Sequence, residues 1–256
     1  MPSVLFAEQK LSVYFLNDSI NGLKVSDAYE THNMGLRFDI EDKFITLDLG
    51  IVSPDMHIYK NQYRVANRSF GELVTLSMGQ KIAISESLEL SYHGEIKSSG
   101  SFGLDKMQDF MHRLLTLQPV NSVNDLVRMP DKTWIGFGIN GSYDLGEKFT
   151  FFDRLGLNSY LGQDKIEISP YVFGSLNQNA YILTNEIGLR AIFHDEIVSA
   201  PPIEAEHRNV IPYIEFGIIF DLFDAKWFIK DRFSLPSIEN DNKLYGVLNV
   251  GLSIEL

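Results

Sequence analysis

The sequence predicts an all-β protein, a 12-stranded antiparallel transmembrane β-barrel with a short helix in one extracellular loop. Two patterns carry this prediction: the alternation along the last segment and the lengths of the connections. Residues 245–256 alternate throughout, with Leu248 and Val250 on one face and Asn249 and Gly251 on the other. Such a strand leaves a free edge in a soluble protein, whereas in a barrel the last strand pairs with the first and no edge remains.

The same period of two recurs along the chain and predicts twelve strands between turn residues. Their expected ranges are 11–17, 33–41, 43–52, 68–79, 87–97, 132–144, 148–160, 165–175, 178–193, 208–222, 225–235 and 243–256. In the third of these, Leu47 and Leu49 share one face, while Thr46 and Asp48 share the other. Charges on the polar faces favour a barrel with a polar interior over a soluble sandwich core.

Short and long connections alternate between these strands. The short turns are Glu41–Asp42, Ser85–Glu86, Leu145–Glu147, Asn177 and Phe223–Asp224, and the longer connections are 18–32, 53–67, 98–131, 194–207 and 236–242. Only the connection near 161–164 is short where a long one is due. Tight turns at one rim and long loops at the other are typical of bacterial outer-membrane barrels, and an even strand number puts both termini at the periplasmic rim.

Aromatic residues occur near the ends of the predicted strands, and a histidine lies within one of them. Aromatic residues near strand ends are candidates for girdles at the membrane interfaces, although some of them must pack between strands. They are Tyr160, Tyr171, Tyr181, Trp134, Trp227 and Phe228. His93 shares a face with Ser91 and Glu95, so we expect it to be a satisfied polar group of the barrel interior.

Composition agrees with a barrel and excludes other classes. The chain has 256 residues, 45% of them hydrophobic, yet its mean hydropathy is only -0.05, because alternation hides apolar content from such averages. It contains no cysteine, which rules out disulfides and thiolate metal sites. A net charge of -12 argues against nucleic acid as a partner. Acidic loops or an acidic lumen can recruit divalent cations, but the charge can also serve solubility alone.

The chain has the organisation of one domain over residues 1–256, because it shows no internal repeat, low-complexity tract or linker. Residues 1–7 resemble the end of a secretory signal peptide without its charged and apolar parts. The sequence also lacks a phosphate loop, a dinucleotide-binding fingerprint and a Gly-Xaa-Ser-Xaa-Gly motif. These absences argue against nucleotide chemistry and against a serine nucleophile.

One long connection changes the period from two to that of a helix. In residues 104–117 the apolar side chains form one stripe, and Pro119 ends the run. Gln108 and His112 are four residues apart, so they lie one turn apart on the same side of this helix. The simplest interpretation is a helical plug with a solvated histidine, and the alternative is a functional site at the rim of the loops.

The sequence resembles a family of outer-membrane lipid A 3'-O-deacylases and their uncharacterised relatives. Five segments carry the resemblance, in the same order and spacing over about the first half of the chain. They are Phe15-Leu16-Asn17-Asp18, His32-Asn33-Met34-Gly35-Leu36-Arg37-Phe38, Ser53-Pro54, Asn67-Arg68-Ser69-Phe70-Gly71 and Gln108-Asp109-Phe110-Met111-His112-Arg113. Beyond residue 130 only the strand pattern is shared.

The resemblance implies a calcium-dependent esterase that hydrolyses an acyloxyacyl ester of lipopolysaccharide in the Gram-negative outer membrane. It makes His112 the general base that activates water, Asp18 a Ca²⁺ ligand, and Asn17 a second ligand or an oxyanion donor. Supporting positions are Thr31, Asn33, Gln108 and Gln118. Lys60, Arg64 and Arg68 are candidates to bind lipid A phosphates. The alternative is that they are ordinary charged residues of surface loops. We expect a monomer.

Two positions depart from the family pattern. Family members usually read Tyr-Thr-Xaa-Gly where this chain has His32-Asn33-Met34-Gly35, so the threonine is replaced by Asn33 or moved to Thr31. The acidic residue expected six positions after the helical histidine is Gln118 here. Neither Asn nor Gln carries a charge, although both can offer a carbonyl oxygen. These departures favour the alternative function, a catalytically inactive barrel with a structural or binding role.

Overall fold

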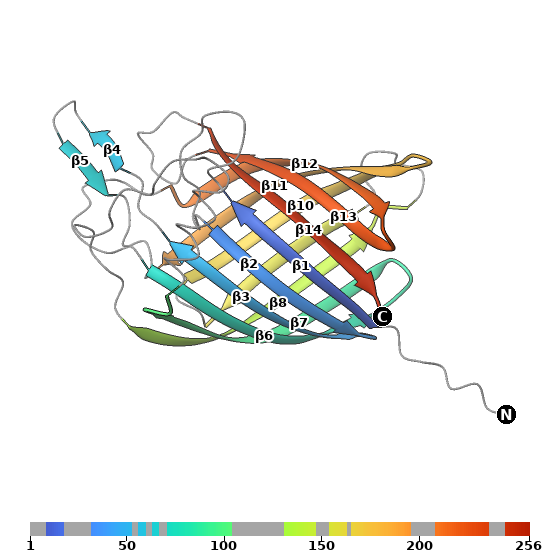
Figure 1. The fold of residues 1–256 in the computed structure, drawn as a ribbon, viewed down its shortest axis with the longest axis horizontal. Coiled ribbons are helices and arrows are strands. Elements are labelled where there is room, and N and C mark those ends of the chain that lie inside the picture. Colours follow the sequence, from blue (N-terminus) through green and yellow to red (C-terminus); the bar gives the residue numbers. More distant parts are fainter. Residues whose placement is uncertain are drawn as a thin grey trace.

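A closed barrel of twelve antiparallel strands forms the body of the molecule in the computed structural model (Figure 1). The structure describes residues 9–17, 32–52, 56–59, 63–66, 71–103, 131–146, 154–162, 165–195, 208–235 and 244–256. The barrel strands are β1 (Gln9–Asn17), β2 (His32–Ile40), β3 (Lys43–Val52), β6 (Gly71–Ala83), β7 (Leu88–Gly100), β8 (Lys132–Asp144), β9 (Arg154–Leu161), β10 (Lys165–Asn177), β11 (Tyr181–Asp195), β12 (Val210–Leu222), β13 (Ala225–Ser234) and β14 (Tyr245–Glu255). The prediction of twelve strands in a closed barrel is confirmed.

Each strand pairs with its neighbours in the chain, and β1 pairs with β14 to close the barrel. Lys10 lies opposite Glu255 and Asn17 lies opposite Leu248, so β1 begins at the rim where β14 ends. The described short turns, such as Glu41–Asp42 and Phe223–Asp224, lie at this rim, and the strand ends that the long connections join lie at the other, as the sequence predicts. We call these the short-turn rim and the long-connection rim.

A small hairpin, β4 (Met56–Tyr59) and β5 (Tyr63–Ala66), lies within the long connection between β3 and β6. Sequence analysis expected only a connection at 53–67, because two four-residue strands are too short to show a period. The helix predicted at 104–117 lies outside the described residues. Among the described residues, no helix is long and apolar enough to cross a membrane.

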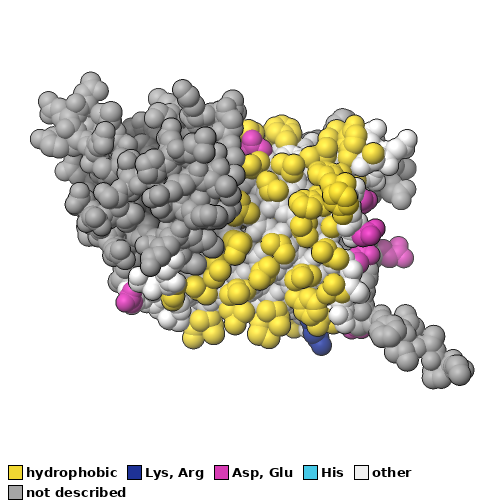
Figure 2. Space-filling model, in the orientation of Figure 1, with side chains coloured by type: hydrophobic (Ala, Val, Ile, Leu, Met, Phe, Trp, Pro, Cys, Tyr) yellow, Lys and Arg dark blue, Asp and Glu magenta, His cyan; other side chains and the backbone are white. Residues whose placement is uncertain are grey.

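The barrel is apolar outside and polar inside. Large hydrophobic side chains are exposed on the outer wall, with Ile135 at 75% exposure (Figure 2). Charged side chains are instead buried in the lumen, among them Glu95, Lys97, Glu167 and Glu215. This distribution reverses that of a soluble protein and suits a wall that faces lipid.

Aromatic rings lie flat against the inner wall, each over a glycine on the neighbouring strand. A Cβ atom built on Gly156 would lie 2.0 Å from Cζ of Tyr171, which is its partner in the β9–β10 register. The same arrangement joins Tyr14 to Gly35, Phe44 to Gly79, Tyr160 to Gly138, Tyr213 to Gly188 and Phe228 to Gly251. Because these rings lie flat, they cover the inner face of the wall and leave the centre of the lumen open.

The expected aromatic girdle is therefore only partly correct. Tyr160, Tyr171 and Phe228 face the lumen, because each ring covers a glycine of the inner wall. Trp134 is buried on the inner face, next to the exposed outer-wall residue Ile135. A period of two separates the two faces of a strand, but it does not say which face holds an aromatic residue near the strand end.

Candidate functional site

The predicted site residues that the structure describes begin at the long-connection rim. Asn17 is the last residue of β1, and its Cα atom lies opposite those of His32 and Leu248. Asn33 lies one residue further along β2, opposite Leu16. The register therefore places these two predicted positions on adjacent strands at the same rim.

Other predicted positions are located only in part. Arg64 lies on β5 of the small hairpin, opposite Ile58. His112, Asp18, Thr31, Gln108, Gln118, Lys60 and Arg68 lie outside the described residues. Their roles stay predictions.

A cavity of about 560 Å³ occupies the barrel lumen. Its lining consists of Tyr14, Leu16, Asn33, Arg37, Phe44, Thr46, Asp48, Thr75, Ser77, His93, Glu95, Lys97, Asn140, Tyr160, Glu167, Arg190, Glu215, Arg232, Val247 and Asn249. Asn33 belongs to this lining, so it connects the predicted site at the rim with the luminal cavity.

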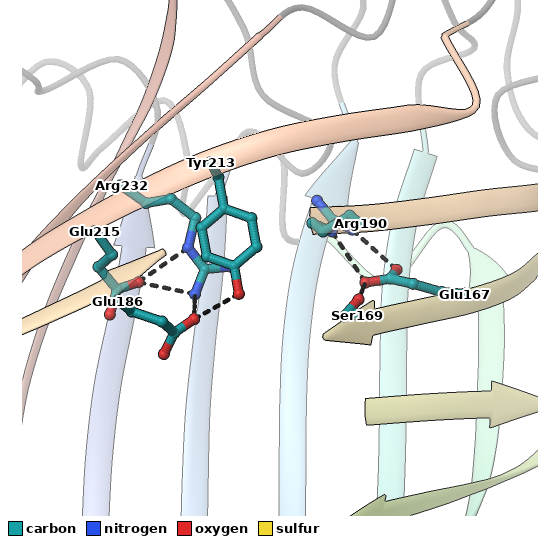
Figure 3. Close-up of polar contacts among 7 residues, drawn as sticks. All are labelled: Glu167, Ser169, Glu186, Arg190, Tyr213, Glu215 and Arg232. Carbon is teal, nitrogen blue, oxygen red and sulfur yellow. Dashed lines mark hydrogen bonds and ion pairs between the residues drawn. The ribbon is translucent and has the colours of Figure 1, made fainter. Parts of the chain in front are cut away.

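One cluster of charges in the cavity joins β10 to β11. Arg190 donates from Nε to Oε1 of Glu167 at 2.9 Å and from Nη2 to Oε2 at 3.0 Å (Figure 3). Ser169 donates to the same Oε1 at 2.6 Å. A bidentate arginine–carboxylate pair is strong and directional, so it holds the two strands at this register.

A second cluster joins β11, β12 and β13. Arg232 donates to Glu215 at 2.9 Å and lies 3.4 Å from Glu186 (Figure 3). Lys230 lies 3.2 Å from Glu215. The hydroxyl of Tyr213 donates to Glu186 at 2.6 Å, and the Arg232 guanidinium lies 4.3 Å from the centre of the Tyr213 ring. Two carboxylates and two cations thus neutralise one another inside the wall.

His93 lies in the lumen, as predicted from its face of β7. It is buried, its Nε2 lies 3.9 Å from Oε2 of Glu95, and its ring contacts those of Phe44 and Tyr160. A histidine packed between two rings suits a structural role better than proton transfer to a substrate.

Sequence analysis placed Thr46 and Asp48 on a polar face but did not find the two charge clusters. Alternation gives the face of a residue, whereas its partner depends on the register between strands. Glu167 and Arg190, for example, are 23 residues apart and meet only because β10 pairs with β11. The signal that could have found them is the repeated placement of charge on the inner faces of consecutive strands.

The described residues do not contain a group of three or more His, Asp or Glu side chains that could hold a metal ion. The ligands that the family resemblance implies are Asn17, whose strand position is known, and Asp18, which lies outside the described residues. Calcium binding at this rim therefore stays a prediction.

The closed barrel, its apolar outer wall and its charged lumen together define the fold of an outer-membrane-type β-barrel. Among solved structures, the fold is similar to that of LpxR from Salmonella typhimurium, with a TM-score of 0.74 and 9% identity over 96% of this chain and 100% of that chain. The KdgM porin has a TM-score of 0.48 and 5% identity over 96% of this chain and 99% of that chain. The Pseudomonas putida toluene transporter TodX has a TM-score of 0.44 and 9% identity over 96% of this chain and 88% of that chain. No family model and no curated protein sequence matches the chain.

Proposed function

We propose that this protein is an outer-membrane esterase that removes an acyloxyacyl chain from lipid A, as a lipid A 3'-O-deacylase does. One observation carries the proposal: over 96% of the chain the fold is similar to that of LpxR, a lipid A deacylase. The ordered segments in the first half of the sequence support it independently.

In this proposal His112 takes a proton from water as the water attacks the ester carbonyl. The ester C–O bond then breaks, and His112 returns the proton to the leaving alkoxide oxygen, so the fatty acid leaves and a hydroxyl group remains on the lipid. Asn17 and Asp18 would hold Ca²⁺, which when bound would polarise the carbonyl. Lys60, Arg64 and Arg68 would pair with the lipid A phosphates.

The alternative is a barrel without catalysis, with a structural or binding role. Asn33 and Gln118 favour it, because they replace a hydroxyl group and a carboxylate of the family pattern with neutral amides. The luminal charge clusters also suit a stable scaffold, since their carboxylates form ion pairs with arginine and lysine side chains of the same barrel wall.

Mass spectrometry of lipid A from Gram-negative cells expressing the chain tests the proposal. We expect the wild-type protein to remove a mass equal to one acyloxyacyl group. His112→Asn should lose about 10²–10⁴-fold in rate, the usual contribution of a general base. Asp18→Ala should also lose activity but regain part of it in excess calcium, because it weakens a ligand and spares the proton transfer.

Folding is the control, measured for every variant as the shift in gel migration between unheated and boiled samples. Unchanged lipid A with folded wild-type protein and added calcium would favour the inactive scaffold. Full activity in folded His112→Asn would remove His112 from the mechanism.

A further inference from the structure

The turn between β12 and β13 carries a residue that its backbone disfavours. Leu222 pairs with Ala225, so Phe223 and Asp224 form a two-residue turn, and both have positive φ, 54° and 57°. Turns with this geometry favour Asn-Gly, because a bulky side chain in the left-handed region meets its own backbone. Phenylalanine at this position is therefore not explained by the turn.

Packing within the chain does not explain Phe223 either. Its side chain is 87% exposed, the largest value among the large hydrophobic residues that the structure describes. An aromatic ring at the tip of a strained turn has two unfavourable features and gains no burial from its own chain. A contact outside the chain is the remaining physical reason for it.

The apolar outer wall continues onto this turn. Leu222 shares the outer face of β12 with Phe216, which lies at 52% exposure, and is itself 45% exposed. Trp227 donates from Nε1 to the carbonyl of Leu222 at 3.0 Å, which places its indole beside the turn. Leu256, beyond the end of the neighbouring strand β14, is 68% exposed at the same rim. Phe223 thus extends a surface that faces lipid along the rest of the wall.

We propose that Phe223 is a membrane anchor, inserted at the boundary of headgroups and acyl chains in the leaflet on the short-turn side. Aromatic rings concentrate at this boundary, where the ring is partly removed from water. This inference rests on the membrane location within the proposed function and is independent of lipid A hydrolysis. It also explains an aromatic residue in a strained turn, because Phe223 lies at the tip of the β12–β13 hairpin.

The absence of cysteine makes a depth measurement direct. We would introduce Phe223→Cys, attach a nitroxide, and reconstitute the protein in phosphatidylcholine vesicles. Collisional accessibility to oxygen, which concentrates in lipid, is compared with accessibility to a water-soluble nickel chelate. The lipid control is Phe216→Cys in the middle of the wall, and the aqueous control is Glu86→Cys in another short turn.

We expect the label at 223 to favour oxygen over nickel, as the label at 216 does and in contrast to the label at 86. A label at 223 that behaves like the label at 86, or that neither reagent reaches, would overturn the anchor, the second result by indicating a protein contact. If the label at 216 also favours nickel, the membrane location itself is wrong, and the anchor is wrong with it.

A second comparison does not depend on a label. Phe223→Asn and Glu41→Asn both place a tolerant residue at a positive φ in a turn of the short-turn rim, since Glu41 has φ 52°. In vesicles we expect Phe223→Asn to lower the urea midpoint of unfolding and Glu41→Asn to leave it unchanged or raise it. A rise in both variants would overturn the anchor.

Discussion

The aromatic rings on the inner wall depend on single glycines. Gly156 allows the Tyr171 ring to lie against the strand, because a methyl group there would be 2.0 Å from the ring. We expect Gly156→Ala to destabilise the barrel by about 1–3 kcal/mol, the usual effect of overpacking. Urea unfolding in vesicles gives the value.

Gly94→Ala is the matched control for this change. Its added methyl group would meet only the carbonyl of Gly136, at 3.9 Å, so we expect a change within about 0.5 kcal/mol. A combined Gly156→Ala and Tyr171→Val variant should lose less stability than the sum of its single changes. Equal losses at Gly156 and Gly94 would show that the flat ring has no part in the effect.

The bidentate pair between Arg190 and Glu167 gives a second prediction for single residues. Glu167 is 8% exposed, so Arg190→Met removes a guanidinium from a buried carboxylate. Breaking a buried pair costs about 3–5 kcal/mol, and water in the luminal cavity should reduce this loss. The double variant Arg190→Met with Glu167→Gln should recover part of it in the same unfolding measurement. A double variant less stable than Arg190→Met would contradict the pairing.

Strand β13 carries one charged side chain that faces outward, toward the apolar outer wall. Lys230 and Arg232 contact Glu215 in the lumen, so Asp231 between them faces outward, beside Phe216 and Leu248. Its Oδ1 has no hydrogen-bond partner among the residues that the structure describes. A carboxylate on an apolar wall is expected to reduce stability in a bilayer.

We therefore expect Asp231→Leu to stabilise the barrel in vesicles by about 1–2 kcal/mol, less than the ~2–4 kcal/mol that a basic side chain costs at mid-depth. Asp221→Leu at the exposed short-turn rim is the control and should be nearly neutral. The readout is the free energy of unfolding in urea. A loss of stability in Asp231→Leu would mean that the carboxylate has a stabilising contact of its own.

The strands and their order around the barrel could be predicted from the sequence, whereas the register between them could not. The period of two along segments such as 132–144 reflects a wall with one apolar face, and β8 has these bounds. The strand predicted at 68–79 ends too early, because β6 continues to Ala83, which pairs with Glu89 near the turn. At the candidate site, the register places Asn17 and Asn33 on adjacent strands, but the remaining positions depend on connections that no period describes.

The whole molecule should show the gel behaviour of a closed membrane barrel. Backbone hydrogen bonds join every barrel strand to two neighbours, so no barrel strand can separate without breaking a full ladder. We expect the unheated protein to migrate faster in detergent gels than the boiled protein and to resist urea. A detergent-independent soluble monomer without this shift would contradict the membrane location.

The pairing of β1 with β14 also has a consequence for how the barrel folds. Most strand pairs join neighbours in the chain and need only a short loop, but this seam brings together residues separated by nearly the entire sequence, such as Lys10 and Glu255. Closing so long a loop has an entropic cost before the contact returns any free energy, so high contact order slows folding. Local hairpins such as β2–β3 and β12–β13 should form early, and the seam should be the last and rate-limiting contact.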